Sequence, residues 1–266
     1  MKNLKSILIE GLADWDEGDF EKSIKKDTSL RNLEWRIKDW IKENTFCDSR
    51  SIRVYGDEAP YKVDTKWVIF NKDVEAITNG LFKWGRIDGN FECKDCKKIK
   101  TLENGPEYVE GNFICWRCEN LESLNMENLE VRKNFNIIMC PKLKSLEGGP
   151  IKVTGDFNCR QSSLESLKGA PMRVWGDFIA DGSKDLESLD METELVHGDF
   201  IIDKCTKLKS LKGSPEKVDG NFRCRECPQL NDSTGVSKYI GGNLSCNKTK
   251  LKPKEIDTQI KGKIVK

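Results

Sequence analysis

The chain has 266 residues, of which 37% are hydrophobic, which is enough for one large domain or two ordinary ones with a real core. Although 33% of the residues are charged, the formal net charge is only +1, which argues against binding nucleic acid or an anionic membrane through a global field. No apolar run approaches the roughly 18 residues that span a bilayer. An acidic stretch stands where a signal peptide would have its cleavage site. We therefore expect a cytoplasmic protein whose 11 cysteines are reduced.

The N-terminal part of the sequence contains two apolar patterns with helical spacing. Residues 1–27 are predicted to form a flexible or docking segment, one helical face of which would carry Leu4, Ile7, Leu8 and Leu12. Residues 28–45 are predicted to form a helix that caps the structure that follows. The apolar face of this cap would comprise Leu30, Leu33, Ile37, Trp40 and Ile41.

From residue 87 onward the sequence repeats with a period of 22 residues, shortened once to 21. Each repeat contains an anchor residue, and the anchors are Phe91, Phe113, Phe135, Phe157, Phe178, Phe200, Phe222 and Leu244. A β-branched residue precedes each anchor by four positions, Asn or Asp precedes it by one, and a leucine pair follows in most copies. Most copies then contain G-x-P or N-G-P. A repeat of this length indicates a solenoid.

Two aromatic residues further upstream extend the pattern. Val63 precedes Trp67 by four positions, so Trp67 is predicted to be an anchor, and Phe46 is predicted to be a degenerate first anchor. The predicted solenoid therefore covers residues 46–251. Residues 252–266 are predicted to form a C-terminal cap or tail.

Within each repeat the V-x-G-x-F-x-C pattern alternates with period two, so we expect one strand per coil, with Val, Gly, Phe and Cys on its inner face. Such a strand buries its apolar face only when it stacks in parallel on copies of itself, about 4.8 Å apart. The leucine pairs would line the opposite side of the core, and the Gly-Pro pairs would form return turns. The predicted fold is a mainly β repeat solenoid with an N-terminal α-helical cap.

The consensus F-x-C-x-x-C/S-x-x-L-x-S-L-x-G-x-P-x-x-V-x-G-D/N-F resembles the leucine-rich repeat, in the short Gly-Pro-rich version common in tailed, crAss-like phages of gut bacteria. The segments "MKNLKSILIEG" and "ITNGLFKWGRIDGNF" are also similar to members of that phage group. The resemblance implies a solenoid that makes protein–protein contacts, in the host cell cytoplasm or in the virion. The chain departs from the family in its Phe anchors, in Cys at many Asn positions, and in two coils ("LNMENLEV", "LDMETELV") without the Gly-Pro turn.

Two CxxC pairs, Cys93/Cys96 and Cys115/Cys118, have the spacing of a zinc ribbon. In other repeats the same two columns contain Ile, Ala or Ser, which are not zinc ligands. Because a buried free cysteine behaves as a small hydrophobe, we interpret both columns as core packing. A zinc-dependent nucleic-acid binder is the alternative hypothesis for these pairs.

Catalysis has little support in the sequence. The only histidine is His197. The corresponding position varies widely among the other repeats, so His197 is expected at the surface. The Asn or Asp before each anchor would suit a hard cation such as calcium, but a short polar side chain that bonds the local backbone at a strand start explains it more simply. No nucleophile has a neighbouring base, and no phosphate-binding loop is present. We expect no enzyme activity, no cofactor and no metal.

Function is expected on the outward-facing residues after each anchor, because the inward ones are committed to packing. Exposed Ile is unusual on a solvated sheet, and Trp and Arg are favoured in interfaces, although β-propensity alone also accounts for Ile there. The candidate partner-binding residues are Ile114, Trp116, Ile138, Arg160, Ile179, Asp181, Ile201 and Asp203. An acidic frame of Asp177, Asp181, Asp199 and Asp203 would favour a basic partner.

These features predict a non-enzymatic interaction module of phage origin that binds a host or virion protein through the exposed face of its parallel sheet. A virion-associated or packaged structural protein, docked through residues 1–27, is the alternative. No nucleic-acid partner and no membrane partner is expected.

Overall fold

The computed structural model describes residues 17–56, 58–126, 128–252, 254 and 256–266, with side chains described from residue 31 onward. The apolar face predicted for the docking segment, from Leu4 to Leu12, lies outside the described residues. The chain divides into two units, residues up to 40 and residues 41–266.

Helix α2 (Glu17–Asn44) is 28 residues long. It covers nearly all of the predicted cap and also part of the segment predicted to be flexible or docking, where Glu and Lys residues favour helix. Of the predicted apolar face, Ile37 and Ile41 are fully buried. The carbonyl of Asn44 accepts a hydrogen bond of 2.9 Å from the N–H of Asn71, and the next residue already belongs to a strand.

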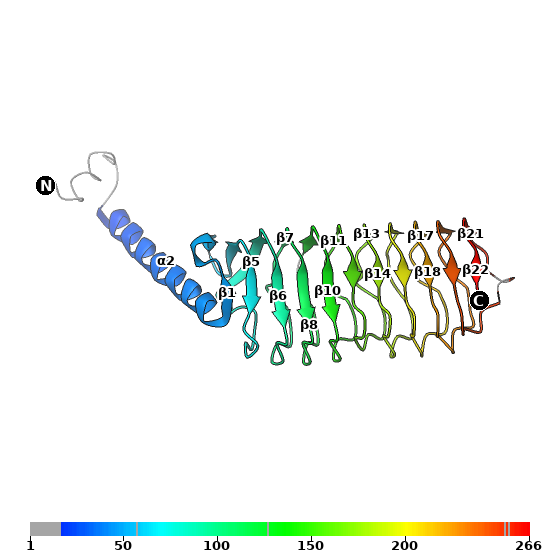
Figure 1. Ribbon diagram of the computed structural model, residues 1–266. Coiled ribbons are helices and arrows are strands. Elements are labelled where there is room, and N and C mark those ends of the chain that lie inside the picture. The colour runs from blue at the N-terminus through cyan, green and yellow to red at the C-terminus, as the bar shows by residue number, and fades with distance from the viewer. Residues whose placement is uncertain (1–16, 57, 127, 253, 255) are drawn as a thin grey trace. The chain divides into compact units, whose positions relative to one another are not determined.

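Residues 45–266 form two 11-stranded sheets (Figure 1). The anchor sheet consists, in order, of β1 (Thr45–Cys47), β4 (Val68–Phe70), β6 (Phe91–Lys94), β8 (Phe113–Trp116), β10 (Phe135–Ile138), β12 (Phe157–Asn158), β14 (Phe178–Ile179), β16 (Phe200–Ile201), β18 (Phe222–Arg223), β20 (Leu244–Ser245) and β22 (Ile264–Val265). The valine sheet consists, in order, of β2 (Arg53–Tyr55), β3 (Tyr61–Thr65), β5 (Phe82–Ile87), β7 (Tyr108–Val109), β9 (Glu130–Val131), β11 (Lys152–Val153), β13 (Arg173–Val174), β15 (Leu195–Val196), β17 (Lys217–Val218), β19 (Tyr239–Ile240) and β21 (Gln259–Ile260).

The predicted parallel solenoid is confirmed, but each coil contains two short strands where we predicted one. Phe113 pairs with Phe91 and Phe135 in the anchor sheet, while Val109 pairs with Ile87 and Val131 in the valine sheet. The chain bends between the two strands, at the Gly-Asx pair or, in one repeat, at Lys133-Asn134. Val and Phe of one repeat therefore line two different walls of the same core.

A row of phenylalanine rings, stacked from Phe91 to Phe178 and tilted or edge-to-face from there to Phe222, fills the centre of the solenoid. The centroids of neighbouring anchor rings, from Phe91 to Phe222, are 4.8–5.3 Å apart, and every anchor is fully buried. The leucine pairs and the β-branched residues of the valine sheet from Ile87 to Ile240 are also fully buried. Because no single coil can bury its apolar side chains alone, stacking supplies the core.

The start of the solenoid corrects two predicted anchors. Strands β1 and β2 run antiparallel to β4 and β3, with the short 3-10 helix η1 (Ser49–Ser51) between them. Phe46 lies on β1 with 66% of its surface exposed, so it is not an anchor. Val68, and not Trp67, pairs with Phe91. Trp67 is 38% exposed and occupies the corner position that Asn or Asp takes in later coils.

Residues 252–266, predicted to be a cap or tail, contribute a further rung. Strands β21 and β22 extend the two sheets in parallel, with Ile264 paired to Leu244 and Ile260 paired to Ile240. The solenoid therefore continues past residue 251.

Candidate functional site

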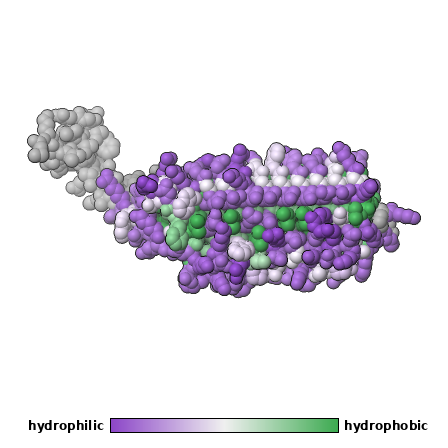
Figure 2. Space-filling model, viewed as in Figure 1, coloured by the Kyte–Doolittle hydropathy of each residue, from purple (hydrophilic) through white to green (hydrophobic). Residues whose placement is uncertain are grey.

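The candidate site is the outer face of the anchor sheet, which carries the predicted partner-binding residues. Alternation along each strand points the anchor inward and the next residue outward. Ile114 and Trp116 on β8 pair in register with Asn136 and Ile138 on β10, and Ile179 on β14 pairs with Ile201 on β16. Figure 2 shows a hydrophobic band along the solenoid beside a continuous polar row.

The apolar side chains on this outer face are neither fully buried nor fully exposed to solvent. Trp116 is 37% exposed, and the four isoleucines are half-buried. Asn136 and the buried Asn158 separate two apolar groups, one of Ile114, Trp116 and Ile138 and one of Ile179 and Ile201. The sheet thus brings together residues that are up to 87 positions apart in the sequence.

Asp203, a predicted partner-binding residue, is instead committed to neighbouring arginines. Its side chain is only 7% exposed, and its Oδ2 lies 2.7 Å from a guanidinium nitrogen of Arg223 and 2.7 Å from one of Arg225. Its Oδ1 accepts the backbone N–H of Arg225 at 2.7 Å. Burial alone would raise the pKa of Asp203, but the two arginines outweigh burial and lower this pKa. Asp203 therefore offers no free charge to a partner.

A ladder of Asn and Asp side chains, one residue before each anchor, runs along the anchor sheet. Each side-chain Oδ1 accepts the backbone N–H of the corresponding residue one coil further on, with N–H···O distances of 2.7–3.1 Å between donor and acceptor. The members are Asn90, Asn112, Asn134, Asp156, Asp177, Asp199, Asn221 and Asn243. The bonds join neighbouring coils, whereas we predicted bonds to the local backbone.

The ladder changes the predicted acidic frame. Asp177 and Asp199 each use Oδ1 for the next coil, and both remain half-buried at one edge of the face. With Asp203 paired to arginines, Asp177 and Asp199 line that edge, and Asp181 is the one acidic residue of the predicted frame that remains on the other side of Ile179 and Ile201. Among the described residues, no group of three or more His, Cys, Asp or Glu is placed to hold a metal ion.

The cysteine columns are part of the core. Cys93 and Cys115 are in-register neighbours on β6 and β8, and both are fully buried. The thiol of Cys118 donates to the carbonyl of Cys93 at 3.2 Å. The hydroxyl of Ser162 makes the same bond, to Ile137, at 3.4 Å, whereas the buried hydroxyl of Ser183, in the next coil, has no hydrogen-bond partner among the described residues. The interval of 22 residues between the two CxxC pairs is the repeat period.

The outer face of the valine sheet carries a row that the sequence analysis did not single out. The ring of Trp175, 50% exposed, stacks on His197 with centroids 4.6 Å apart. Nδ1 of His197 lies 2.9 Å from a carboxylate oxygen of Asp219, which also pairs with Lys217 at 2.8 Å. Trp175, His197 and Asp219 occupy the same position in three successive repeats, and Lys217 lies two residues before Asp219. The alignment of the repeats could therefore have predicted that these side chains are neighbours. His197 is a surface residue, as predicted, but it has specific partners.

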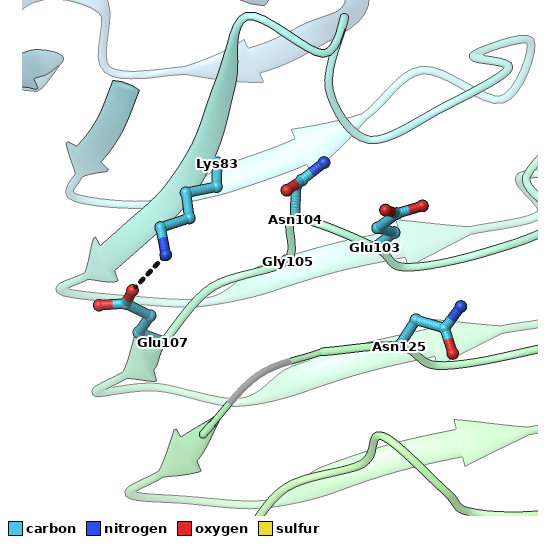
Figure 3. A pocket seen from close by; sticks show the side chains of 6 residues that line it. All are labelled: Lys83, Glu103, Asn104, Gly105, Glu107 and Asn125. Atoms are coloured by element: carbon cyan, nitrogen blue, oxygen red, sulfur yellow. Dashed lines mark ion pairs between the residues drawn. The ribbon is translucent and has the colours of Figure 1, made fainter. Parts of the chain in front are cut away.

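A small polar cavity opens near the start of the solenoid (Figure 3). Its volume is about 70 Å³, and it is lined by Lys83, Glu103, Asn104, Gly105, Glu107 and Asn125. Nζ of Lys83 and Nζ of Lys62 lie 3.0 Å and 2.7 Å from carboxylate oxygens of Glu107. Because a water molecule needs about 10–15 Å³ by this kind of measure, the cavity suits a few waters.

Comparisons add no relative for this chain: no family model, no curated protein and no solved structure matches it. In the part of the chain that the structure describes, no helix has the length and apolar character needed to cross a bilayer. Functional inference therefore depends on the surfaces described above.

Proposed function

We propose that the protein is a non-enzymatic interaction module that binds a protein partner through the outer face of the anchor sheet. The observation that supports this most is the pair of apolar groups, Ile114, Trp116 and Ile138 in one and Ile179 and Ile201 in the other, on the open face of the anchor sheet. Trp is among the residues that contribute most to the binding energy of protein interfaces, and the buried centre of an interface is apolar.

The contrast between the two sheets favours the anchor sheet as the binding face. The outer face of the valine sheet is covered by mutual contacts, such as Arg86 with Asp88 and Glu110, Tyr108 with Glu110, and Arg173 with Glu194. A partner would have to replace those contacts. The isoleucines of the anchor sheet make no such polar contacts, so covering them costs little and removes apolar area from water.

Affinity capture tests the proposal. The tagged full chain is used as bait in the cells that produce it, and proteins retained by the wild type are quantified by mass spectrometry. Removal of one central interface side chain often weakens binding 10-fold or more, so Trp116→Ala and Ile201→Ser should each lose the specific prey.

Trp175→Ala is the matched control, because it removes an exposed Trp from the other sheet. Thermal unfolding and far-ultraviolet circular dichroism establish that each variant is folded. A prey that stays bound to both anchor-sheet variants and is lost from Trp175→Ala would place the interface on the valine sheet and refute the proposal.

A further inference from the structure

The candidate face has two edges of opposite charge around its second apolar group. On one edge lie the ladder carboxylates Asp156, Asp177 and Asp199, all half-buried. In each of them, Oδ1 accepts a hydrogen bond from the next coil. Of these three carboxylates, Asp199 is the one whose Oδ2 also accepts a hydrogen bond from a described residue. Three adjacent carboxylates about 4.8 Å apart thus give this edge a continuous negative charge.

The opposite edge is basic. Arg160 and Lys204 are exposed, and neither forms an ion pair with any residue that the structure describes. Arg225 on this edge and Arg223, which pairs in register with Ile201, share the single carboxylate of Asp203 and leave one positive charge in excess. Asp181 opposes one of these charges, and Glu226 is paired with Lys248 at 3.8 Å. The balance on this edge is therefore positive.

Between these edges run Ile179 and Ile201, one per coil. Their spacing of about 4.8 Å is closer to one helical turn, about 5.4 Å, than to the roughly 6.7 Å between same-face residues of a strand. A helix along the solenoid axis would therefore place one apolar residue on each coil. From Ile114 to Ile201 the face spans four coil steps, about 19 Å, which is about 13 helical residues, and only the coil of Phe157, with Asn158 and Arg160, lacks an outward apolar residue.

We propose that the partner presents an amphipathic helix along this face, with basic residues on one flank of its apolar stripe and acidic residues on the other. The basic flank lies over Asp156, Asp177 and Asp199, and the acidic flank lies over Arg160 and Lys204. This inference depends on the proposed function, and it specifies the chemistry of the partner.

A panel of three peptides tests the inference with the full-length protein. The peptides share about 18 residues and one leucine stripe, and differ only in their flanks: Lys on one and Glu on the other, Lys on both, or Glu on both. Binding is measured by fluorescence anisotropy. Because each mismatched flank places like charges together, we expect the Lys/Glu peptide to bind at least 10-fold more tightly than the other two.

Charge reversal supplies the decisive comparison. Arg160→Glu combined with Lys204→Glu makes both edges acidic, so the peptide with two Lys flanks should become the tightest binder. Lys207→Glu, a reversal at a turn residue paired with Asp185, is the control and should leave the ranking unchanged. Circular dichroism establishes folding of both variants.

Three results would overturn the inference: equal affinities for the three peptides, a ranking that the double reversal leaves unchanged, or no binding of any peptide. None of these decides the proposed function, which stands or falls on prey capture by the Trp116 and Ile201 variants. The two failures are therefore distinguishable.

Discussion

Oδ1 of Asn134 accepts the backbone N–H of Asp156, 22 residues further on, with a donor–acceptor distance of 2.9 Å. This bond replaces a strand-to-strand bond at the corner of the coil, where the backbone bends away from both sheets. A short side chain with a carbonyl or carboxylate oxygen is needed there, because the corner N–H would otherwise lack a partner.

We therefore expect Asn134→Ala to destabilise the protein by about 1–3 kcal/mol, since it leaves the N–H of Asp156 unsatisfied. Asn134→Asp keeps the acceptor and should cost far less. Urea unfolding gives the change in stability, and hydrogen–deuterium exchange at Asp156 reports the bond directly. Unchanged exchange at Asp156 in Asn134→Ala would show that the ladder bond does not protect this amide.

Glycine precedes seven of the eight ladder residues, the exception being Lys133 before Asn134, and close approach favours glycine there. A Cβ on Gly198 would lie 2.2 Å from Oδ1 of Asp177 and 2.7 Å from the backbone of Gly176. Gly198→Ala should therefore destabilise the protein by more than about 2 kcal/mol, because the ladder must separate to accept the methyl group. Gly80→Ala is a useful reference, since a Cβ there has nothing within 4 Å, so its cost comes from its positive φ alone. Comparable urea midpoints for the two variants would argue against the close-approach explanation.

The residue four positions after each anchor has a left-handed backbone conformation in every coil from Phe91 to Leu244. Gln161 has φ of +56° and Gly182, its neighbour in the next coil, has φ of +72°. A non-glycine residue in this conformation destabilises the folded protein by about 1 kcal/mol or more. Glycine avoids this strain, but it loses more conformational entropy on folding, which offsets part of the gain. We expect Gln161→Gly to stabilise the protein by about 0.5–1 kcal/mol and Gly182→Ala to destabilise it. Thermal unfolding of the pair, compared with the wild type, measures both signs. A lower melting temperature for Gln161→Gly would contradict the argument.

The sequence was sufficient for the stacking of the coils and insufficient for their internal geometry. Anchors such as Phe113 were predicted because a fixed period leaves one possible register. The bend at Gly111 was missed because the period-two pattern continues across it, and only the approach of Asn90 Oδ1 to that glycine shows why the chain turns there. The anchor at Val68 was missed because an aromatic residue stood next to it, and register is set by the backbone bonds of β4 and β6.

In the candidate site, too, the repeat pattern predicted the direction of the side chains but not their contacts. The outward direction of Ile179 and Ile201 follows from alternation and was predicted. The neutralisation of Asp203 involves Arg223 and Arg225, 20 and 22 residues away, and depends on how two long side chains fold back along one face. Periodicity places such residues in adjacent coils, but the rotamers decide which charges remain free.

The buried thiols give a prediction that separates core packing from a zinc site. Burial raises the pKa of Cys159 and Cys224, and a buried thiol is both protonated and inaccessible to reagents. We expect iodoacetamide at pH 7.5 to modify Cys47, which is half-buried, before any other cysteine of the native protein. Protein unfolded in urea should consume 11 equivalents. Modification of Cys93 and Cys115 that a chelator accelerates would instead indicate a metal site.

Asp203 should make stability depend on pH. Because the arginines lower its pKa in the folded protein, its stabilising contribution is fully present above the unfolded value of about 3.9 and is lost as the pH falls through the lower folded value. Asp203→Asn should destabilise the protein by about 1–3 kcal/mol at pH 7. This is less than for a fully buried pair, since the Arg223 and Arg225 side chains are 31% and 43% exposed and can be hydrated.

The difference in unfolding free energy between wild type and Asp203→Asn, measured by urea unfolding, should shrink as the pH is lowered below about 4. Asp73→Asn, at an exposed position, is the matched control for the substitution and should leave stability at pH 7 nearly unchanged. A difference between wild type and Asp203→Asn that stays constant from pH 7 to pH 3 would mean that the carboxylate charge does not contribute to stability.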